Sequence, residues 1–152
     1  MDLIHIAIVE DEPLFVGQLT EYIRRYEKDS GRRIKITTFA DGEDITDDYR
    51  GGYDIILMDI QMRFMDGMTA AEKIRTLDHE VIIMFITNMI QYAVRGYEVD
   101  AMDYVVKPVE YFAFSQKLDK AIGRIKRAVQ VSISVPTEDG LQKLAVSDIY
   151  YI

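Results

Sequence analysis

The fold is decided by the stretch LIHIAIVEDE, residues 3–12. Its first seven residues are almost all apolar and rich in β-branched side chains, which is typical of a central strand covered on both faces. Three acidic residues, Glu10, Asp11 and Glu12, follow without a break. In an open parallel sheet the carboxyl ends of the strands face one crevice, where ligands bind. The stretch therefore predicts a buried strand that ends at a ligand site.

Three later strand-like runs end on side chains that can handle a phosphoryl group or a hard cation. They are residues 55–58 before Asp59, residues 81–86 before Thr87 and residues 102–106 before Lys107. If all four strands lie parallel in one sheet, these side chains meet in one pocket, although the sequence scatters them over about a hundred positions.

Between the strand-like runs lie segments with apolar residues at helical spacing. The predicted helices cover residues 13–30, 43–50, 67–77, 91–99 and 109–128, and a further strand covers residues 34–39. Strands that alternate with helices of this length predict a parallel sheet with right-handed crossovers and helices on both faces. The predicted fold class is α/β, a doubly wound five-stranded parallel sheet built from five βα units.

The pattern changes after residue 128. Two alternating runs flank a turn signal within residues 131–146, which predicts a C-terminal β-hairpin. Residues 149–152 start another strand. Because a lone hairpin is marginal in water, we expect one domain over residues 1–128 and the beginning of a second domain over residues 129–152.

The composition excludes several classes of protein. With 18 basic and 26 acidic residues, the formal charge is 18 − 26 = −8, which argues against a nucleic-acid-binding face on this chain. Cysteine is absent, so a disulfide scaffold, a thiolate zinc site and a cysteine nucleophile are excluded. The apolar runs have strand length and the N-terminus lacks a signal-peptide pattern. We therefore expect a cytoplasmic protein with no membrane partner.

The acidic residues at the first and third strand ends predict a metal site. Acidic residues are common in turns, so Glu10 and Asp11 alone would be a weak signal, but Asp59 ends a buried run in a neighbouring unit. Three crowded carboxylates raise one another's pKa and destabilise the fold unless a cation joins them. Mg²⁺ prefers oxygen ligands and is typically held by one or two carboxylates plus a phosphate, so the cluster favours Mg²⁺ over zinc.

Asp59 is either a metal ligand only or also a nucleophile, because aspartate can form a covalent phosphoryl intermediate. Phosphoryl transfer depends mainly on positioning and charge neutralisation. The Lys107 ammonium and the Thr87 hydroxyl would supply both from the other strand ends. Each residue alone is more often an ordinary surface lysine or strand threonine, but together with the acidic cluster they favour a phosphoacceptor site.

The motifs strongly resemble the receiver domain of bacterial two-component response regulators over about residues 3–128. They are IVEDEP at 8–13, DIILMDIQM at 54–62, MDG at 65–67, FIT at 85–87 and DYVVKP at 103–108. The resemblance implies a flavodoxin-like (βα)5 fold with strand order 2-1-3-4-5, and phosphorylation of Asp59 by a sensor histidine kinase. It also implies a Mg²⁺ site made of Glu10, Asp11, Asp59 and the backbone carbonyl of Gln61.

The resemblance further implies a switch. Thr87 and Tyr104 would form the switch pair, and the Lys107–Pro108 peptide bond would be cis. Phosphorylation would change the surface made by the fourth and fifth helices and promote a homodimer. Such a protein is a phosphoacceptor switch rather than an enzyme, with at most slow self-dephosphorylation.

Two residues depart from the family pattern. Arg63 stands where the family usually has proline, so we expect a more mobile loop after Asp59 and an extra cation near the site. Asn88 follows Thr87 where a smaller residue is common, which would narrow access for the kinase histidine.

The tail resembles the opening strands of a LytTR-type DNA-binding domain, through residues 131–135, Gly140 and residues 148–152. This resemblance implies that the chain ends inside its effector domain. Control of transcription, and any contact with DNA, would then need residues beyond Ile152.

Two alternative functions remain open. A Mg²⁺-dependent aspartyl phosphatase has a similar site, but it usually carries a second aspartate two positions after the nucleophile, where this chain has Gln61. A phosphorylation-independent interaction domain would not need the intact acidic cluster. Uptake of a phosphoryl group from a small phosphodonor with Mg²⁺ would reduce the uncertainty most, and the rate of phosphate release would separate a switch from a phosphatase.

Overall fold

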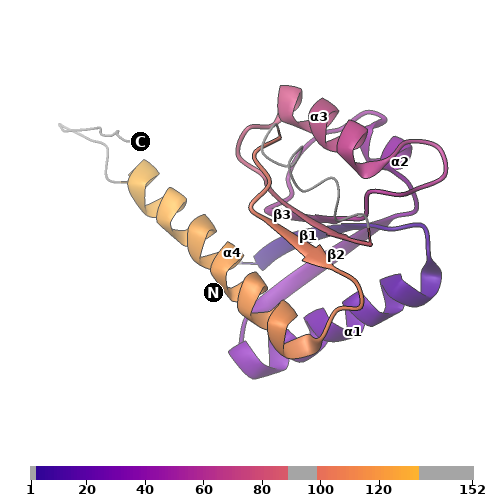
Figure 1. Ribbon diagram of the computed structural model, residues 1–152. Helices are drawn as coiled ribbons and strands as arrows, with labels where there is room; N and C mark the ends of the chain where they lie inside the picture. The colour runs from indigo at the N-terminus through magenta and orange to yellow at the C-terminus, as the bar shows by residue number, and fades with distance from the viewer. Residues whose placement is uncertain (1–2, 89–98, 134–152) are drawn as a thin grey trace. The chain divides into compact units, whose positions relative to one another are not determined.

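The computed structural model describes residues 3–88 and 99–133, with side chains as far as residue 125. The chain forms two compact units, Met1–Ser115 and Gln116–Ile152. The first unit holds a sheet of five parallel strands in the order β2-β1-β3-β4-β5 (Figure 1). The strands are β1 Leu3–Val9, β2 Arg33–Phe39, β3 Ile55–Met58, β4 Ile82–Thr87 and β5 Asp103–Val106.

Four described helices complete the element order. They are α1 Pro13–Ser30, α2 Gly42–Thr46, α3 Gly67–Leu77 and α4 Tyr111–Ile133, the last of which begins in the first unit and ends in the second. Figure 1 shows α1 on one face of the sheet and α2 with α3 on the other. The doubly wound parallel sheet and its strand order are therefore confirmed.

The core under α2 and α3 explains why these strands are almost wholly apolar. β3 and β4 are buried at every position, because helices cover both faces of the sheet centre. One cluster joins strand residues to helix residues: Ala7, Val9, Ile56, Met58, Ile83 and Phe85 with Ile45, Met68, Ala70, Ala71 and Ile74. Burying a side chain of valine, leucine, isoleucine or phenylalanine size contributes about 1.5–3 kcal/mol, so this cluster fixes the sheet.

The strand register sets the position of the polar residues that follow. Val9 pairs with Met58, and Met58 pairs with Phe85. The chain therefore leaves β1 and β3 at the same level of the sheet, which places Glu10 beside Asp59.

Two predicted boundaries were wrong. α2 ends at Thr46 rather than at Arg50, because Asp47 leaves the helix in an extended conformation and Asp48 adopts a positive φ of 58°. α4 continues to Ile133, where a strand was expected from Val131. The short run at 131–133 fits both a helical and a strand period, so periodicity alone could not decide it.

Two further predictions lie outside the described residues. These are the helix predicted for residues 91–99, of which the structure describes only Val99, and the remainder of the hairpin segment at residues 134–152. The domain boundary expected after residue 128 stays a prediction.

Candidate functional site

The carboxyl ends of β1, β3, β4 and β5 meet at a polar cavity of about 310 Å³. Its lining residues are Glu10, Asp11, Glu12, Asp59, Gln61, Thr87, Asn88 and Lys107. Every strand-end residue singled out in the sequence is among them, and Gln61 lies there too. The structure therefore brings together residues that the sequence places in four separate βα units.

Three carboxylates form the acidic part of the cavity. Glu10, Asp11 and Asp59 each offer an oxygen atom, and these atoms lie within 4.8 Å of one another. Glu10 and Asp59 are buried, at 3% and 7% exposure, whereas Asp11 is exposed. Burial and the neighbouring charge of Asp59 raise the pKa of Glu10 to about 7, although the hydrogen bond from Lys107 opposes this. The cluster thus holds more negative charge than its surroundings stabilise.

Lys107 supplies the opposing charge. Its Nζ lies 3.0 Å from Glu10 Oε1 and 3.4 Å from Asp59 Oδ2, and its side chain is 12% exposed. Burial would lower the pKa of Lys107, but the hydrogen bond to Glu10 and the charges of Asp59 and Glu10 raise it above the ordinary value. Lys107 is therefore a protonated cation fixed inside the cavity.

Phe15 on α1 also contacts this cation, with Lys107 Nζ 4.0 Å from the centre of its ring. A cation over an aromatic face is attracted by the ring quadrupole. Sequence analysis missed this role, because Phe15 fits the apolar stripe of its helix. Its place in the first helical turn, three residues after the acidic run, is the signal that could have revealed it.

The backbone around Asp59 is tightly constrained. The N–H of Asp59 donates to Val9 O at 3.0 Å, and the carboxylate Oδ1 accepts from Ile60 N at 2.8 Å. Behind it, a Cβ on Gly67 would overlap the carbonyl oxygen of Asp59, so only glycine allows α3 to begin so close to the strand end. Asp66 caps this helix by accepting from Thr69 N at 2.8 Å.

The two residues of the predicted switch pair, Thr87 and Tyr104, differ in their position relative to the cavity. Thr87 is fully buried at the end of β4 and lines the cavity. Tyr104 on β5 is not among the lining residues of the described chain; its ring packs against Phe85, with centroids 6.0 Å apart. The Lys107–Pro108 peptide bond is cis, as expected.

Residues 6–119 match the family described as the response regulator receiver domain. The chain belongs to this family. The sequence-based resemblance to receiver domains is thereby confirmed, and the cavity lies at the carboxyl end of the sheet of this receiver.

Relatives with transcriptional or sensory names are similar to most of this receiver chain. The sensory transduction protein LytR of Streptococcus agalactiae serotype V is 28% identical over 142 residues, which cover 92% of this chain and 55% of that protein. The transcriptional regulatory protein YpdB of Escherichia coli strain K12 is 29% identical over 159 residues, which cover 96% and 64%. The receiver chain thus spans between about half and two thirds of the length of these relatives.

Solved receiver structures share the fold. The response regulatory domain of MrkE from Klebsiella pneumoniae has a TM-score of 0.73 and 28% identity, covering 82% of this chain and 99% of that one. The receiver domain of sensor histidine kinase PA1611 from Pseudomonas aeruginosa has a TM-score of 0.69 and 25% identity, covering 80% and 99%. The latter has a magnesium ion coordinated in its active-site cleft.

The two departures from the family pattern have different positions. Asn88 lines the cavity of the receiver, as expected for a residue that follows Thr87. Arg63 is exposed, with its guanidinium 5.9 Å from the ring centre of Phe64. The loop of Arg63 is held by Asp41, a residue that sequence analysis missed: Phe64 N and Met65 N both donate to its carboxylate.

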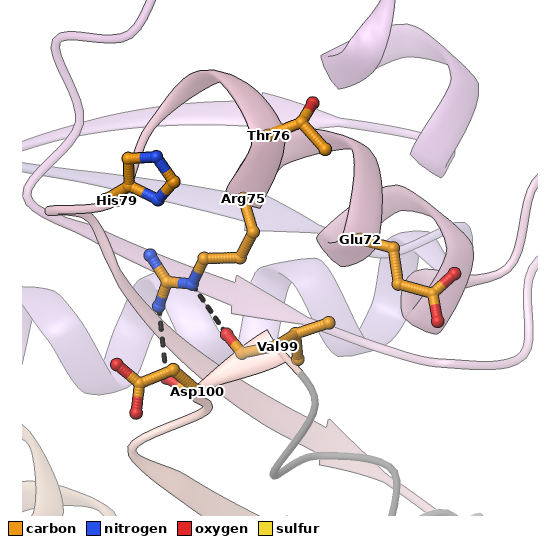
Figure 2. A pocket seen from close by; sticks show the side chains of 6 residues that line it. All are labelled: Glu72, Arg75, Thr76, His79, Val99 and Asp100. Atoms are coloured by element: carbon orange, nitrogen blue, oxygen red, sulfur yellow. Dashed lines mark hydrogen bonds between the residues drawn. The ribbon is translucent and has the colours of Figure 1, made fainter.

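A second cavity of about 550 Å³ lies beside the end of α3 (Figure 2). Arg75 extends into it, but its guanidinium donates to the backbone carbonyls of Val99 at 2.6 Å and Asp100 at 3.1 Å, as Figure 2 shows, and to Val81 O at 2.6 Å. These bonds use Arg75 to join α3 to the segments that flank β4 and β5. The guanidinium has a structural role, and the acidic cavity is the candidate site.

No helix among residues 3–88 and 99–133 is long and apolar enough to cross a membrane.

Proposed function

We propose that this receiver accepts a phosphoryl group on Asp59 from a sensor histidine kinase and thereby switches an output surface. The observation that carries the proposal is the position of Asp59. It is 7% exposed, shares a cluster with Glu10 and Asp11, and lies 3.4 Å from Lys107 Nζ. A carboxylate so placed can act as a nucleophile while neighbouring groups neutralise the incoming charge.

Mg²⁺ would be held by Glu10, Asp11, Asp59 and the backbone carbonyl of Gln61. The donor set fits, because all the donors are hard oxygen atoms and because the raised pKa of Glu10 reflects burial beside another carboxylate. When bound, the ion would neutralise charge on the phosphoryl oxygens. The magnesium in the similar PA1611 receiver supports this assignment.

The chain's own residues would share the work of transfer. An Asp59 carboxylate oxygen forms a bond to phosphorus while the bond between phosphorus and the donor breaks. The Lys107 ammonium pairs with a phosphoryl oxygen, and the Thr87 hydroxyl donates to another. Tyr104 then repacks, so that the charge at Asp59 shifts the population of output conformations.

The output would be control of transcription. Similarity to LytR and YpdB supports a LytTR-type effector that follows a receiver over residues 1–128, with its first strands in residues 129–152. The phosphorylated receiver would form a homodimer in the cytoplasm, and DNA would be bound only through residues beyond Ile152. The net charge of −8 is consistent with a receiver that does not itself bind DNA.

Intact-mass measurement after exposure to acetyl phosphate with Mg²⁺ tests the proposal. One phosphoryl group should be added as acetate leaves, and both Asp59→Asn and EDTA should abolish the addition. Equal labelling of Asp59→Asn, or labelling that persists in EDTA, would overturn the assignment.

Self-dephosphorylation would be slow. Gln61 stands where an aspartyl phosphatase would hold its acid–base aspartate, and an amide cannot transfer that proton. Phosphate release from small phosphoesters should therefore stay far below about 1 s⁻¹, the lower end of ordinary enzyme turnover. Steady release at enzymatic rates would favour the phosphatase instead.

A further inference from the structure

Asp41, between β2 and α2, makes more hydrogen bonds than a helix cap requires. It is 4% exposed and caps α2 by accepting from Glu43 N at 2.9 Å. Its carboxylate also accepts from Phe64 N and Met65 N, each at 2.9 Å, in the loop between β3 and α3. A cap bond is local, whereas these two bonds join segments 23 and 24 residues apart.

The carboxylate is held in its charged form. Burial would raise the pKa of Asp41, but the backbone N–H groups of Phe64, Glu43, Met65 and Arg63 outweigh burial and keep the pKa below its ordinary value. Hydrogen bonds to an ionised acceptor are roughly twice as strong as those between neutral groups. Removing the acceptor would leave several backbone donors unsatisfied in a partly buried loop, which is costly.

The contact between α2 and this loop is also close. A Cβ on Gly42 would lie 2.6 Å from Met65 O, so glycine is needed where the helix meets the loop. Arg63, which stands in the place of the usual proline, has an N–H that proline lacks, and that N–H is one of the groups that stabilise the Asp41 carboxylate. The greater loop mobility expected from Arg63 is thereby opposed by Asp41.

The held loop begins at the phosphoacceptor. Ile60 N donates to Asp59 Oδ1, and Gly67 N donates to Ile60 O at 2.7 Å. Gln61 lines the acidic cavity. In the chain it lies between Ile60, which makes both of these bonds, and residues 63–65, whose N–H groups point to Asp41. The path of the backbone at Gln61 is therefore fixed from both sides.

We propose that Asp41 is a positioning residue of the receiver site: through the backbone of residues 63–65 it fixes the loop that presents the Gln61 carbonyl to Mg²⁺. The inference rests on the proposed phosphoacceptor function. It assigns to the junction of β2 and α2 a part in metal binding, although no atom of Asp41 lines the cavity among the described residues.

The test compares Asp41→Asn and Asp41→Ala with wild type. Asparagine keeps one acceptor oxygen, whereas alanine keeps none. Amide hydrogen exchange at residues 63–65 should accelerate about tenfold in Asp41→Ala, the equivalent of one net hydrogen bond, and less in Asp41→Asn. The Mg²⁺ dissociation constant, measured by calorimetry, should rise about tenfold, the lower end of the effect of outer-shell partners.

Asp66→Ala is the matched control. It removes an aspartate that caps α3 from the same loop, but whose carboxylate accepts from Thr69 N rather than from residues 63–65. Its Mg²⁺ affinity should stay within about twofold of wild type, because the lost bond holds the first turn of α3 and not residues 63–65. If Asp41→Ala does not fold, Asp41→Asn decides the question alone.

The outcomes separate the inference from the function on which it rests. Suppose that wild type takes up a phosphoryl group. Unchanged amide exchange at residues 63–65, or unchanged Mg²⁺ affinity in a folded Asp41→Asn, would then overturn the positioning role alone. A wild type that binds no Mg²⁺ and takes up no phosphoryl group would overturn the proposed function and the inference together.

Discussion

Two carboxyl groups in this receiver, Glu10 and Asp41, are both buried but have different neighbours. Each follows a strand, and they are 3% and 4% exposed. Glu10 lies beside Asp59, and its pKa is raised to about 7. Asp41 lies among backbone N–H groups, and its pKa is lowered. Burial raises the pKa of both groups, and the charge of Asp59 adds to the rise at Glu10. At Asp41 the amide donors outweigh burial.

The different neighbours suit the two carboxylates to different roles, a candidate ligand site at Glu10 and a structural support at Asp41. Amide donors satisfy Asp41 within the folded chain, so it needs no ligand. The acidic cluster is only partly neutralised by Lys107, and a hard cation would relieve the remaining repulsion. The uncompensated cluster is thus the candidate ligand site, and the satisfied carboxylate of Asp41 is suited to fixing a loop.

The largest effect should follow from removing the cation of the cluster. Lys107→Met leaves Glu10 and Asp59 buried without their 3.0 and 3.4 Å partner. We expect the free energy of unfolding at neutral pH without Mg²⁺ to fall by about 3 kcal/mol, as when a buried ion pair loses one member. Urea unfolding measures it.

The exposed Lys73 provides the control for this first prediction. Lys73→Met should change stability by no more than about 0.5 kcal/mol. Adding Glu10→Gln to Lys107→Met should restore part of the loss, because it removes one of the repelling charges. If Lys107→Met were as stable as wild type, the carboxylates of the cluster would not repel one another. The cluster would then be as well satisfied as Asp41.

A slightly smaller effect is expected from the metal itself. Mg²⁺ at about 100 times its dissociation constant should stabilise the wild type by about 2.7 kcal/mol. Asp11 is exposed, so Asp11→Asn should leave the metal-free stability within about 0.5 kcal/mol of wild type but reduce the gain from Mg²⁺. Thermal unfolding with Mg²⁺, and with NaCl at equal ionic strength, distinguishes binding from screening. An equal gain from both salts would count against a metal site.

Asp41 should respond to acid. Its folded pKa is lowered, so its contribution is complete above the unfolded pKa of about 3.9 and is lost as the pH falls through the folded pKa. Asp41→Asn should thus be less stable than wild type by about 1–2 kcal/mol at pH 7. The gap should narrow below about pH 4.

Urea unfolding of both proteins across this pH range measures the gap. Asp66→Ala, which removes the cap bond to Thr69 N, controls for the loss of a helix cap. A gap that stays constant or widens on acidification would show that Asp41 is not held as an anion.

Sequence alone predicted the strand ends because apolar runs and the polar residues after them are adjacent in the chain. Asp59 could be placed at the crevice from the run before it, and Thr87 and Lys107 likewise, since parallel strands share one open edge. The sheet order and the cis bond came from the family resemblance.

The features that the sequence did not predict depend on contacts between distant residues or on a pattern that fits two kinds of secondary structure. In the sequence Asp41 is indistinguishable from an ordinary turn residue, because its partners Phe64 and Met65 belong to another βα unit, more than twenty residues away. The run at 131–133 fits two periods equally, and helix continued where strand was expected.

The smallest effect concerns Phe15, which tests whether the cation of the crevice is held by carboxylates alone. Its ring centre lies 4.0 Å from Lys107 Nζ. Phe15→Leu keeps apolar volume but removes the ring face, so stability should fall by about 0.5–1 kcal/mol. Phe112→Leu, at a 64% exposed phenylalanine, should have less effect.

A double-mutant cycle separates this contact from packing. If the ring attracts the ammonium, Phe15→Leu should cost less in a Lys107→Met background than in wild type, with a coupling of about 0.5 kcal/mol or more in urea unfolding. Methionine retains the length of the lysine side chain but not its charge, so lost packing alone would give nearly additive effects. Additivity would assign Phe15 to the core and leave Glu10 and Asp59 as the groups that hold Lys107. Coupling would show that Lys107 is kept in place by two different means, carboxylates and an aromatic ring, whereas the loop at Asp41 is held by amide donors.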